Sequence, residues 1–522
     1  MKKLHPNFIT LLLLTLMMLF GAALAEEAHE PITIMDANRD YRALIELVHE
    51  KYPEINIQIV PYRGKNTTDY MKKQLVTGYM PDIYCTTQAL DGDLQAEHLV
   101  DLSQYAVTDL YNAVRMGEMD VDGAVYLLPY DYNIMGIWCN VSLLERNGIA
   151  VPTSFRELRE ETIPALNAAG ITVSECQLYL PGLYFQMFCN ISGTAFLNTL
   201  EGRTWMRDFI DLSTDVGAVN QPELQECLEL FQQWIDCGMI HTGDKEENAF
   251  PRFAEGNTAF YVGTATRYTQ NEDGTGDQYI LLPYLSEDGT QNVYITQNSR
   301  CYGLNKHLEE PGNEQKLQDA LHVLEVMSTM EGYRALIGDF KNIMCSIREF
   351  SVPEDSPYYE AVRKVSVGYE MPIVYNGWED YMVTFGEAVH AVIEGRVTTQ
   401  EALETLDQTK AQLQTQGETY YAVEVLDTAQ SAQLVGQMFM DATNADVALI
   451  SYNVYYPEVA SPQENVHGVN GQILPGNMSE GDIVIFLPTG WYDNIVTMEA
   501  TGAEIMEIAR EGFDLRGNGY PY

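Results

Sequence analysis

Apolar residues recur near the start of the chain with two different periods. In INIQIV (55–60) they fall on every second position, as in a β-strand with one buried face. Between 41 and 51 they recur at intervals of three and four, as in an amphipathic helix. ITIM (32–35) reads as a further strand before that helix. Strand, helix and strand in this order predict a βαβ unit and therefore an α/β fold with a parallel sheet.

The same periods continue through most of the chain. A helix is predicted at 69–78 and a strand at 81–87, and helices follow at 154–169 and from Pro222 onward. Three more amphipathic helices are predicted between 317 and 414, and the last begins with Thr398-x-x-Glu401, a capping box. Trp138, Trp205 and Trp234 fall in apolar settings and are predicted to lie in the core.

The segment DGAVYLLPYDYNIMGIWCN (122–140) combines a turn, a strand, a proline, aromatic residues and a lone acid. A core strand has little use for so many phenol and indole polar groups, and a surface loop has little use for so much apolar area. We therefore interpret it as a hinge segment that lines a ligand cleft.

The N-terminus has the pattern of an export signal. Lys2 and Lys3 precede the apolar run FITLLLLTLMMLFGA, and Ala23-Leu24-Ala25 provides a small-residue cleavage site. Residues 1–25 are therefore predicted to be a signal peptide. The alternative, an uncleaved anchor, is disfavoured because the run is shorter than the ~20 apolar residues that a membrane span needs.

The composition narrows the possible functions. With 522 residues the chain is long enough for more than one domain. Its 75 acidic and 30 basic residues give a formal charge of −45, which would repel phosphate backbones, so nucleic acid is excluded as a partner. The acids are spread along the whole sequence, as expected for a solvated surface.

No motif of catalysis or metal binding stands out. None of the nine histidines follows an aspartate by two positions, and HExxH, GxSxG, P-loop and GxGxxG patterns are absent from the sequence. Paired carboxylates of a glycoside hydrolase stay open, because spacing in sequence does not give their separation in space. We assign no catalytic residue, no metal ligand and no cofactor.

The eight cysteines form no CxxC pair. Cys227 and Cys237 are predicted to share one helix, where ten residues span ~15 Å and prevent a bridge. Disulfides and buried free thiols both remain possible for the others.

Residues 32–414 resemble the extracellular solute-binding proteins of bacterial ABC importers, in particular the sugar-binding branch. The pieces that carry the resemblance occur in the family's order: LVHEKYPEINIQIVPY, YMKKQLVTGYMPDIYCTT, DGAVYLLPYDYNIMGIWCNVSLLERNGIAVPTSFREL, FAEGNTAFYVGTATR and RCYGLNKHLEEPGNEQKLQDALHVLEVMST. The third matches the hinge signature most closely, with its Asp-Gly-x-x-Tyr-x-x-Pro stretch.

The resemblance implies a two-lobed, periplasmic-binding-protein-like (type II) fold for residues 26–415. Two interleaved α/β lobes are joined by crossing strands with the hinge near 127–135, and a ligand is held between them. Sugars present CH faces and hydroxyl rims, so aromatic, carboxylate and Arg side chains are the expected ligand contacts. The candidate ligand-binding residues are Tyr84, Tyr130, Asp131, Tyr132, Arg267, Tyr268 and Trp378. For each of them, packing between or within the lobes is the alternative.

One position departs from the family pattern. Gram-positive members carry a lipidated cysteine at the cleavage site, where this chain has Glu26, and its first cysteine is Cys85. The protein is therefore expected to be exported, extracellular or at the cell surface without that lipid anchor, and to act as a monomer with an ABC permease.

The last ~95 residues resemble a different family, the C-terminal domain of bacterial 5′-nucleotidases. SAQLVGQMFMDATNADVALISYN, MSEGDIVIFLP and NIVTMEATGAEIMEIAREG follow its order of helix, strand, strand and helix. We place a linker at 416–427 and this smaller α/β domain at 428–522. Its substrate-loop arginine is missing and the sequence stops before the family's closing strands, so the domain is expected to be incomplete.

The sequence thus favours an exported protein that captures a small polar solute, above all a carbohydrate, for an ABC importer, and that is not an enzyme. The alternative is a nucleotide-binding or 5′-nucleotidase-like hydrolase component whose metallophosphatase domain is absent. A surface scaffold made of two binding modules is the third possibility.

Overall fold

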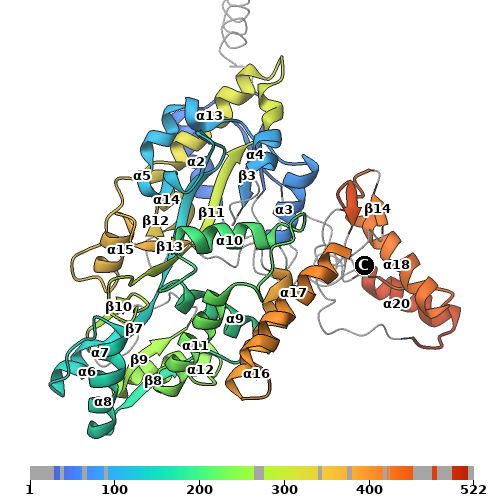
Figure 1. Cartoon of the computed structure of the whole chain (residues 1–522). Coiled ribbons are helices and arrows are strands. Elements are labelled where there is room, and N and C mark those ends of the chain that lie inside the picture. Colours follow the sequence, from blue (N-terminus) through green and yellow to red (C-terminus); the bar gives the residue numbers. More distant parts are fainter. Residues whose placement is uncertain are drawn as a thin grey trace, which may run out of the picture.

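The structure is a computed structural model. It describes residues 29–35, 40–60, 67–86, 92–263, 276–338, 344–372, 379–415, 420–422, 424–450, 473–478 and 497–514. The predicted signal peptide lies outside the described residues. Two lobes, one above the other in Figure 1, form most of the molecule, and a smaller C-terminal part lies beside them.

The first lobe begins with the predicted βαβ unit. Strands β1 (Ile32–Met35) and β2 (Ile57–Val60) are parallel and are connected by helix α2 (Arg42–Lys51), which buries Leu44, Leu47 and Val48. Strand β3 (Ile83–Thr86) joins the other edge of β1, also in parallel. The remaining helices and strands of this lobe are α3 (Thr67–Thr77), α4 (Gly92–His98), β4 (Asp120–Val121), β5 (Ala124–Val125), α5 (Ala113–Gly117), α13 (Glu314–Met327) and α14 (Met330–Ile337).

Two long strands connect this sheet to the second lobe. Strands β6 (Leu128–Met135) and β11 (Tyr294–Leu304) are antiparallel to each other, and β11 also pairs with β3. The short strands β12 (Met344–Cys345) and β13 (Glu370–Pro372) pair with β6 and β11, respectively. The strand order is β12-β6-β11-β3-β1-β2, with β13 beside β11.

The second lobe is built on a four-stranded sheet of order β10-β7-β9-β8. Its strands are β7 (Ile137–Asn140), β8 (Thr172–Cys176), β9 (Thr258–Val262) and β10 (Tyr279–Leu282). Its helices are α6 (Val141–Arg146), α7 (Phe155–Glu157), α8 (Ile163–Ala169), α9 (Pro181–Ser192), α10 (Leu200–Ile210), α11 (Pro222–Asp236), α12 (Glu246–Arg252), α15 (Tyr359–Val365), α16 (Glu379–Ile393) and α17 (Thr399–Thr415). The predicted helix at 154–169 is α7 and α8, with one π-helical turn between them.

Gly136 lies where the chain leaves β6 and enters β7. A Cβ added there would lie 2.1 Å from the carbonyl oxygen of Leu282 in β10, so only glycine allows the two backbones to approach this closely. The passage between the sheets therefore depends on a residue without a side chain.

Each lobe has its own apolar core. One buried cluster surrounds the β1–β3 sheet and another the β7–β10 sheet, and a third, aromatic-rich cluster lies under the crossing strands. Trp138, Trp205 and Trp234 are all buried, which confirms the prediction that they are core residues. Trp234 stacks on Phe155 with ring centroids 4.7 Å apart. Two separate cores are what a two-lobed protein requires.

Helix α17 closes the second lobe and begins as predicted. The Thr398 hydroxyl accepts from the backbone N–H of Glu401 at 3.2 Å, and the Glu401 carboxylate accepts from the backbone N–H of Thr398 at 2.6 Å, which forms the capping box. Further along the helix, the Lys410 ammonium donates to the carbonyl of Val216 at 2.9 Å. These contacts fix α17 to the lobe.

The C-terminal part contains β14 (Tyr420–Ala422), α18 (Thr428–Thr443), β15 (Gly476–Met478) and α20 (Gly502–Asp514). The two predicted helices are present, but DVALI (446–450), predicted as a strand, has no strand partner among the described residues and runs as irregular chain. Strand β14 falls inside the segment predicted as a linker. The predicted strand GDIVIFLP (481–488) lies outside the described residues.

A buried carboxylate joins the strands of the first lobe to its helices. Asp82 accepts from the backbone N–H and hydroxyl of Thr33 at 2.8 and 2.7 Å, and it lies 2.9 Å from His307 and 3.1 Å from Lys316. Burial opposes ionisation, but the hydrogen bonds from His307, Thr33 and Lys316 outweigh it and lower the pKa of Asp82 to about 2.

We expect Asp82→Asn to destabilise the protein at pH 7 by about 2 kcal/mol, the free energy that corresponds to this pKa shift. Because the folded pKa is lower than the unfolded one, this stabilisation is present above about pH 4 and is lost as the pH falls toward 2. Urea unfolding of both proteins across this range measures the difference. The exposed Asp236→Asn is the control, and an equal effect of the two substitutions would contradict the role of Asp82.

Candidate functional site

A group of uncharged polar side chains lies on the strands that cross between the lobes. Asn133 of β6 and Gln297, Asn298 and Ser299 of β11 are partly exposed, whereas most of their neighbours along both strands are buried. We call these four residues the crossing patch. Asn133, Gln297 and Ser299 share one face of the sheet, whereas Asn298 lies opposite Tyr132 and points to the other face.

A β-bulge shapes the crossing patch. The register between β11 and β6 shifts between Asn298 and Arg300, so Ser299 has no directly opposite residue on β6. The Asn133 amide donates to the Ser299 hydroxyl at 2.9 Å, which ties the bulge to the neighbouring strand. Bulges redirect side chains and are frequent next to binding sites.

The patch can both donate and accept hydrogen bonds without carrying charge. Asn and Gln amides and a Ser hydroxyl provide both functions. The Oδ1 atom of Asn298 is buried and has no hydrogen-bond partner among the described residues. An unsatisfied buried acceptor costs about 1–3 kcal/mol, so a ligand or water that donates to it would bind favourably.

A charged cluster adjoins the crossing strands. Arg115 of α5 contacts both Glu118 and Glu370 of β13, and its guanidinium lies 4.8 Å from the centre of the Tyr132 ring. The Arg115 side chain is only 2% exposed. Its Nε and Nη1 atoms have no hydrogen-bond partner among the described residues. The cluster therefore joins α5 of the first lobe to the short strand β13, the neighbour of the crossing strand β11, by buried charges.

The cluster perturbs the ionisation of one of its carboxyls. Burial is the largest cause that raises the pKa of Glu118, to about 8, and the charge and hydrogen bond of Glu370 add to it. The charges of Arg115 and Arg203 act in the opposite direction. Since Arg203 lies on α10 of the second lobe, groups of both lobes act on this carboxyl.

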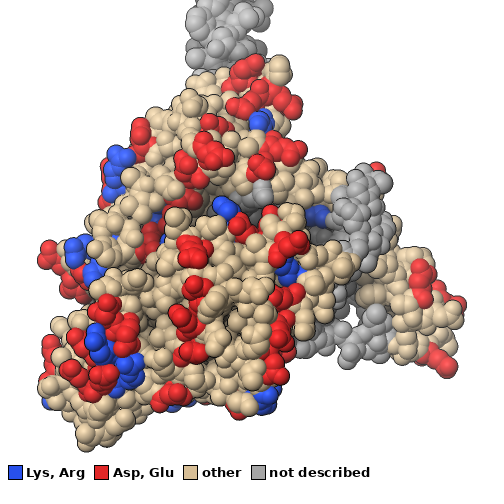
Figure 2. All heavy atoms as spheres, in the orientation of Figure 1, with Lys and Arg blue, Asp and Glu red and all other residues tan. Residues whose placement is uncertain are grey.

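The surface is hollowed between the two lobes. Figure 2 shows a recess between the first lobe and α10, with acidic and basic side chains around it. On the second lobe, Tyr179 and Leu180 follow β8 and are 38% and 49% exposed. They come at the carboxyl end of a strand, immediately before α9, a position from which side chains of α/β sheets commonly contact ligands.

Residues 43–317 match the family model described as bacterial extracellular solute-binding protein, which is more than half of the chain. The chain belongs to this family. No curated protein sequence matches it. Within the residues that the structure describes, no helix is long and apolar enough to cross a membrane, and no three His, Cys, Asp or Glu side chains are grouped so as to hold a metal.

Solved structures have the same fold at low identity. The binding protein MsmE of Bacillus subtilis, in an open conformation, is 16% identical with a TM-score of 0.58, covering 76% of this chain and 100% of its own. The solute-binding protein RafE in complex with raffinose is 16% identical with a TM-score of 0.52, covering 74% and 100%. A chitin oligosaccharide binding protein is 18% identical with a TM-score of 0.54, covering 74% and 99%. These neighbours confirm the type II two-lobed fold.

The structure of this solute-binding protein places Tyr84 and Tyr130 in the core of the first lobe, both 0% exposed. The Tyr84 hydroxyl donates to the carbonyl of Met71 at 2.6 Å, and the Tyr130 ring packs edge-on against Tyr302. Their expected role in the cleft is therefore corrected to packing, because their rings fill the core on which the crossing strands lie.

The other predicted ligand residues have different outcomes. Asp131 is also 0% exposed, opposite Arg300 on β11, and Tyr132 is buried beneath Arg115. Neither reaches solvent in this conformation, although both lie at the boundary between the lobes. Arg267, Tyr268 and Trp378 lie outside the described residues.

The residues of β6 that the sequence assigned to the cleft, Tyr130, Asp131 and Tyr132, are buried in this structure, and the partly exposed position of the strand is Asn133. A signal was present in the polar run TQNS (296–299), an unusual interruption of the strand β11, whose two ends are apolar. Glu370 of the charged cluster is too far from Arg115 and Glu118 in sequence to be linked to them by pattern.

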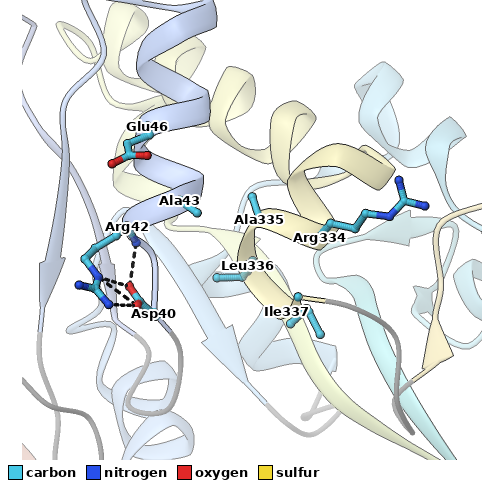
Figure 3. Close-up of a pocket in the computed structure, with 9 residues that line it drawn as sticks. Asp40, Arg42, Ala43, Glu46, Arg334, Ala335, Leu336 and Ile337 are labelled. Atoms are coloured by element: carbon cyan, nitrogen blue, oxygen red, sulfur yellow. Dashed lines mark hydrogen bonds and ion pairs between the residues drawn. The ribbon is translucent and has the colours of Figure 1, made fainter.

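A second hollow lies in the first lobe (Figure 3). It has a volume of about 440 Å³ and is lined by the start of α2 and the end of α14. Asp40 and Arg42 pair with each other at its edge, and the Arg42 hydrogen bond lowers the pKa of Asp40 to about 2. Arg42 is 87% exposed, so this open, self-paired site is less suited to hold a solute than the region between the lobes.

We expect Glu118→Gln to change how stability depends on pH. Because the folded pKa of Glu118 exceeds its unfolded value of 4.5, the folded state holds the extra proton, and stability falls as the pH rises from 4.5 to about 8. The variant should show a smaller decrease over this range in urea unfolding. Glu247→Gln, at an exposed position, is the control, and an unchanged slope for Glu118→Gln would contradict the buried carboxyl.

Proposed function

We propose that this protein captures a neutral oligosaccharide between its two lobes and delivers it to an ABC permease. The observation that carries the proposal is the crossing patch: uncharged donors and acceptors on a bulged strand, at the boundary around which the lobes would close. Sugar hydroxyls donate and accept at the same time, and Asn, Gln and Ser side chains match both functions.

Closure of the lobes would supply the rest of the affinity. A micromolar dissociation constant corresponds to a binding free energy of about 8 kcal/mol. A ligand that contacts both lobes binds the closed form more tightly than the open form, and this difference in affinity shifts the protein toward the closed form. Stacking on an aromatic ring adds roughly 0.5–1.5 kcal/mol beyond area burial. Our candidates for the ligand contacts of the closed form are Tyr179, which follows β8, and three residues chosen from the sequence, Arg267, Tyr268 and Trp378.

The charge of the protein supports a neutral solute. The formal net charge is −45, and the charged cluster next to the crossing strands already pairs Arg115 with two carboxyls. An anionic sugar would be repelled by the surface and would have to compete with Glu118 and Glu370 for the guanidinium. The raffinose and chitin oligosaccharide of two structural neighbours are neutral sugars or amino-sugar amides, which agrees with this choice.

Several finer features complete the proposal. We infer a cleaved signal peptide at 1–25, an extracellular or cell-surface location without a lipidated cysteine, and a monomer, with the domain limits given above. We also propose that residues 428–522 are related to the C-terminal domain of 5′-nucleotidases, as their sequence resemblance suggests.

We expect raffinose or a chitin oligosaccharide to raise the melting temperature of the protein, with nucleosides and peptides as the comparison set. A ligand at a hundredfold excess over its dissociation constant stabilises by about 2.7 kcal/mol. Asn133→Ala should weaken binding of the active sugar by about tenfold in calorimetry, since it removes one hydrogen bond to a neutral group and loosens Ser299.

Gln412→Ala, at an exposed position on α17, is the matched control and should bind as the wild type does. Equal affinities of Asn133→Ala and wild type would remove the crossing patch from the site. The absence of a shift with every sugar, together with metal-dependent phosphate release from AMP, would favour the nucleotidase-like alternative.

A further inference from the structure

The chain that follows the second lobe returns to the first lobe. Helix α17 belongs to the second lobe: Ala402, Leu403 and Leu406 lie in its core, and Asp407 accepts from the backbone N–H groups of Ala218 and Val219. The C-terminal part starts from the end of this helix at Thr415.

Only four residues, 416–419, separate α17 from strand β14. Even a fully extended chain spans at most about 3.6 Å per residue, so Thr415 and Tyr420 are separated by no more than about 18 Å. Whatever holds β14 is therefore kept close to the second lobe by a short covalent connection.

The chain around β14 is held by a second segment, 473–478. Strand β14 pairs antiparallel with β15, with Tyr420, Tyr421 and Ala422 opposite Met478, Asn477 and Gly476, respectively. Leu426 and Ile473 extend this contact, with N–H to carbonyl distances of 2.9 and 3.1 Å in the two directions. The two segments thus form one hydrogen-bonded ribbon.

The ribbon is fastened on two sides. Ile473 and Leu474 are each 2% exposed, but they belong to different cores. Ile473 packs with Ala432 and Val435 of α18, whereas Leu474 belongs to the core of the first lobe. Consecutive residues of extended chain point to opposite sides, which explains how this pair joins the C-terminal part to the first lobe.

From these contacts we propose that the C-terminal part is a strap between the lobes, covalently attached to the second lobe through α17 and anchored in the first lobe by Leu474. The crossing strands act as the hinge, and the strap limits how far the lobes separate around it. Opening beyond the reach of 416–419 requires either the β14–β15 ribbon or the Leu474 anchor to break.

The strap depends on the two-lobed motion of the proposed function but not on the identity of the solute. Its test therefore uses the full chain without ligand, so that failure of sugar binding and failure of the strap give different results. The readout is the radius of gyration from small-angle X-ray scattering, which increases when the lobes separate.

The first variant lengthens the connection without changing a contact. Insertion of eight Gly and Ser residues after Thr415 should increase the radius of gyration. A flexible insertion changes the free energy of folding little, and the longer connection lets the lobes separate further. The same insertion after Gly312, in an exposed turn of the first lobe, is the control and should leave it unchanged apart from the added mass. Equal radii for the two insertions would overturn the proposal.

The second variant breaks the anchor. Leu474→Asp should increase the radius of gyration and speed hydrogen exchange of the Ala422 and Leu426 amides by about tenfold, while helix α18 keeps its protection. Leu449→Asp, 55% exposed in the same C-terminal part, should change neither. If all of α18 loses its protection from exchange, Leu474→Asp has unfolded the C-terminal part. In that case the radius of gyration of the insertion variant decides whether the strap exists. An unchanged radius with a protected ribbon in Leu474→Asp contradicts the anchor.

Discussion

The antiparallel pairing of β6 with β11 is the interaction on which the remaining structure depends. Both strands run through the boundary between the lobes, so the same ladder of hydrogen bonds completes the first sheet and leads into the second. Each lobe has a core of its own, so the lobes can move about these strands while each core stays intact. A hinge that is hydrogen-bonded along its length can bend while its register is kept.

This arrangement sets a conflict at the hinge between stability and function. A continuous ladder would be most stable if its side chains were apolar on both faces, yet the middle of β11 carries Gln297, Asn298 and Ser299 and a bulge. Buried polar atoms that lack partners in the described part of the chain gather near it, among them Thr296 Oγ1 and Asn298 Oδ1. Unsatisfied polar groups in native structures commonly mark binding sites, where the missing partner is the ligand.

Most of the helices and strands could be predicted from the sequence, but fewer of the residues at the candidate site could. Periodicity predicted β1, α2, β2 and α11, and the capping box at Thr398 placed the start of α17, because these signals are local. The hinge was located through its resemblance to a family, but which side chains face the gap depends on strand pairing. Tyr130 was assigned to the cleft on residue type, while the tertiary structure uses its ring to fill the first core. The Arg115 cluster combines α5 with β13, some 250 residues later, and no pattern in one sequence reveals such a pair.

All eight cysteines lie in the described residues as free thiols, and seven of them are buried. Burial is the largest cause that raises the pKa of Cys139, Cys176, Cys301 and Cys345 above the usual value, so almost no thiolate forms at neutral pH. Thiol–disulfide exchange and oxidation proceed through the thiolate. Burial therefore shields these thiols of the folded protein from exchange and oxidation.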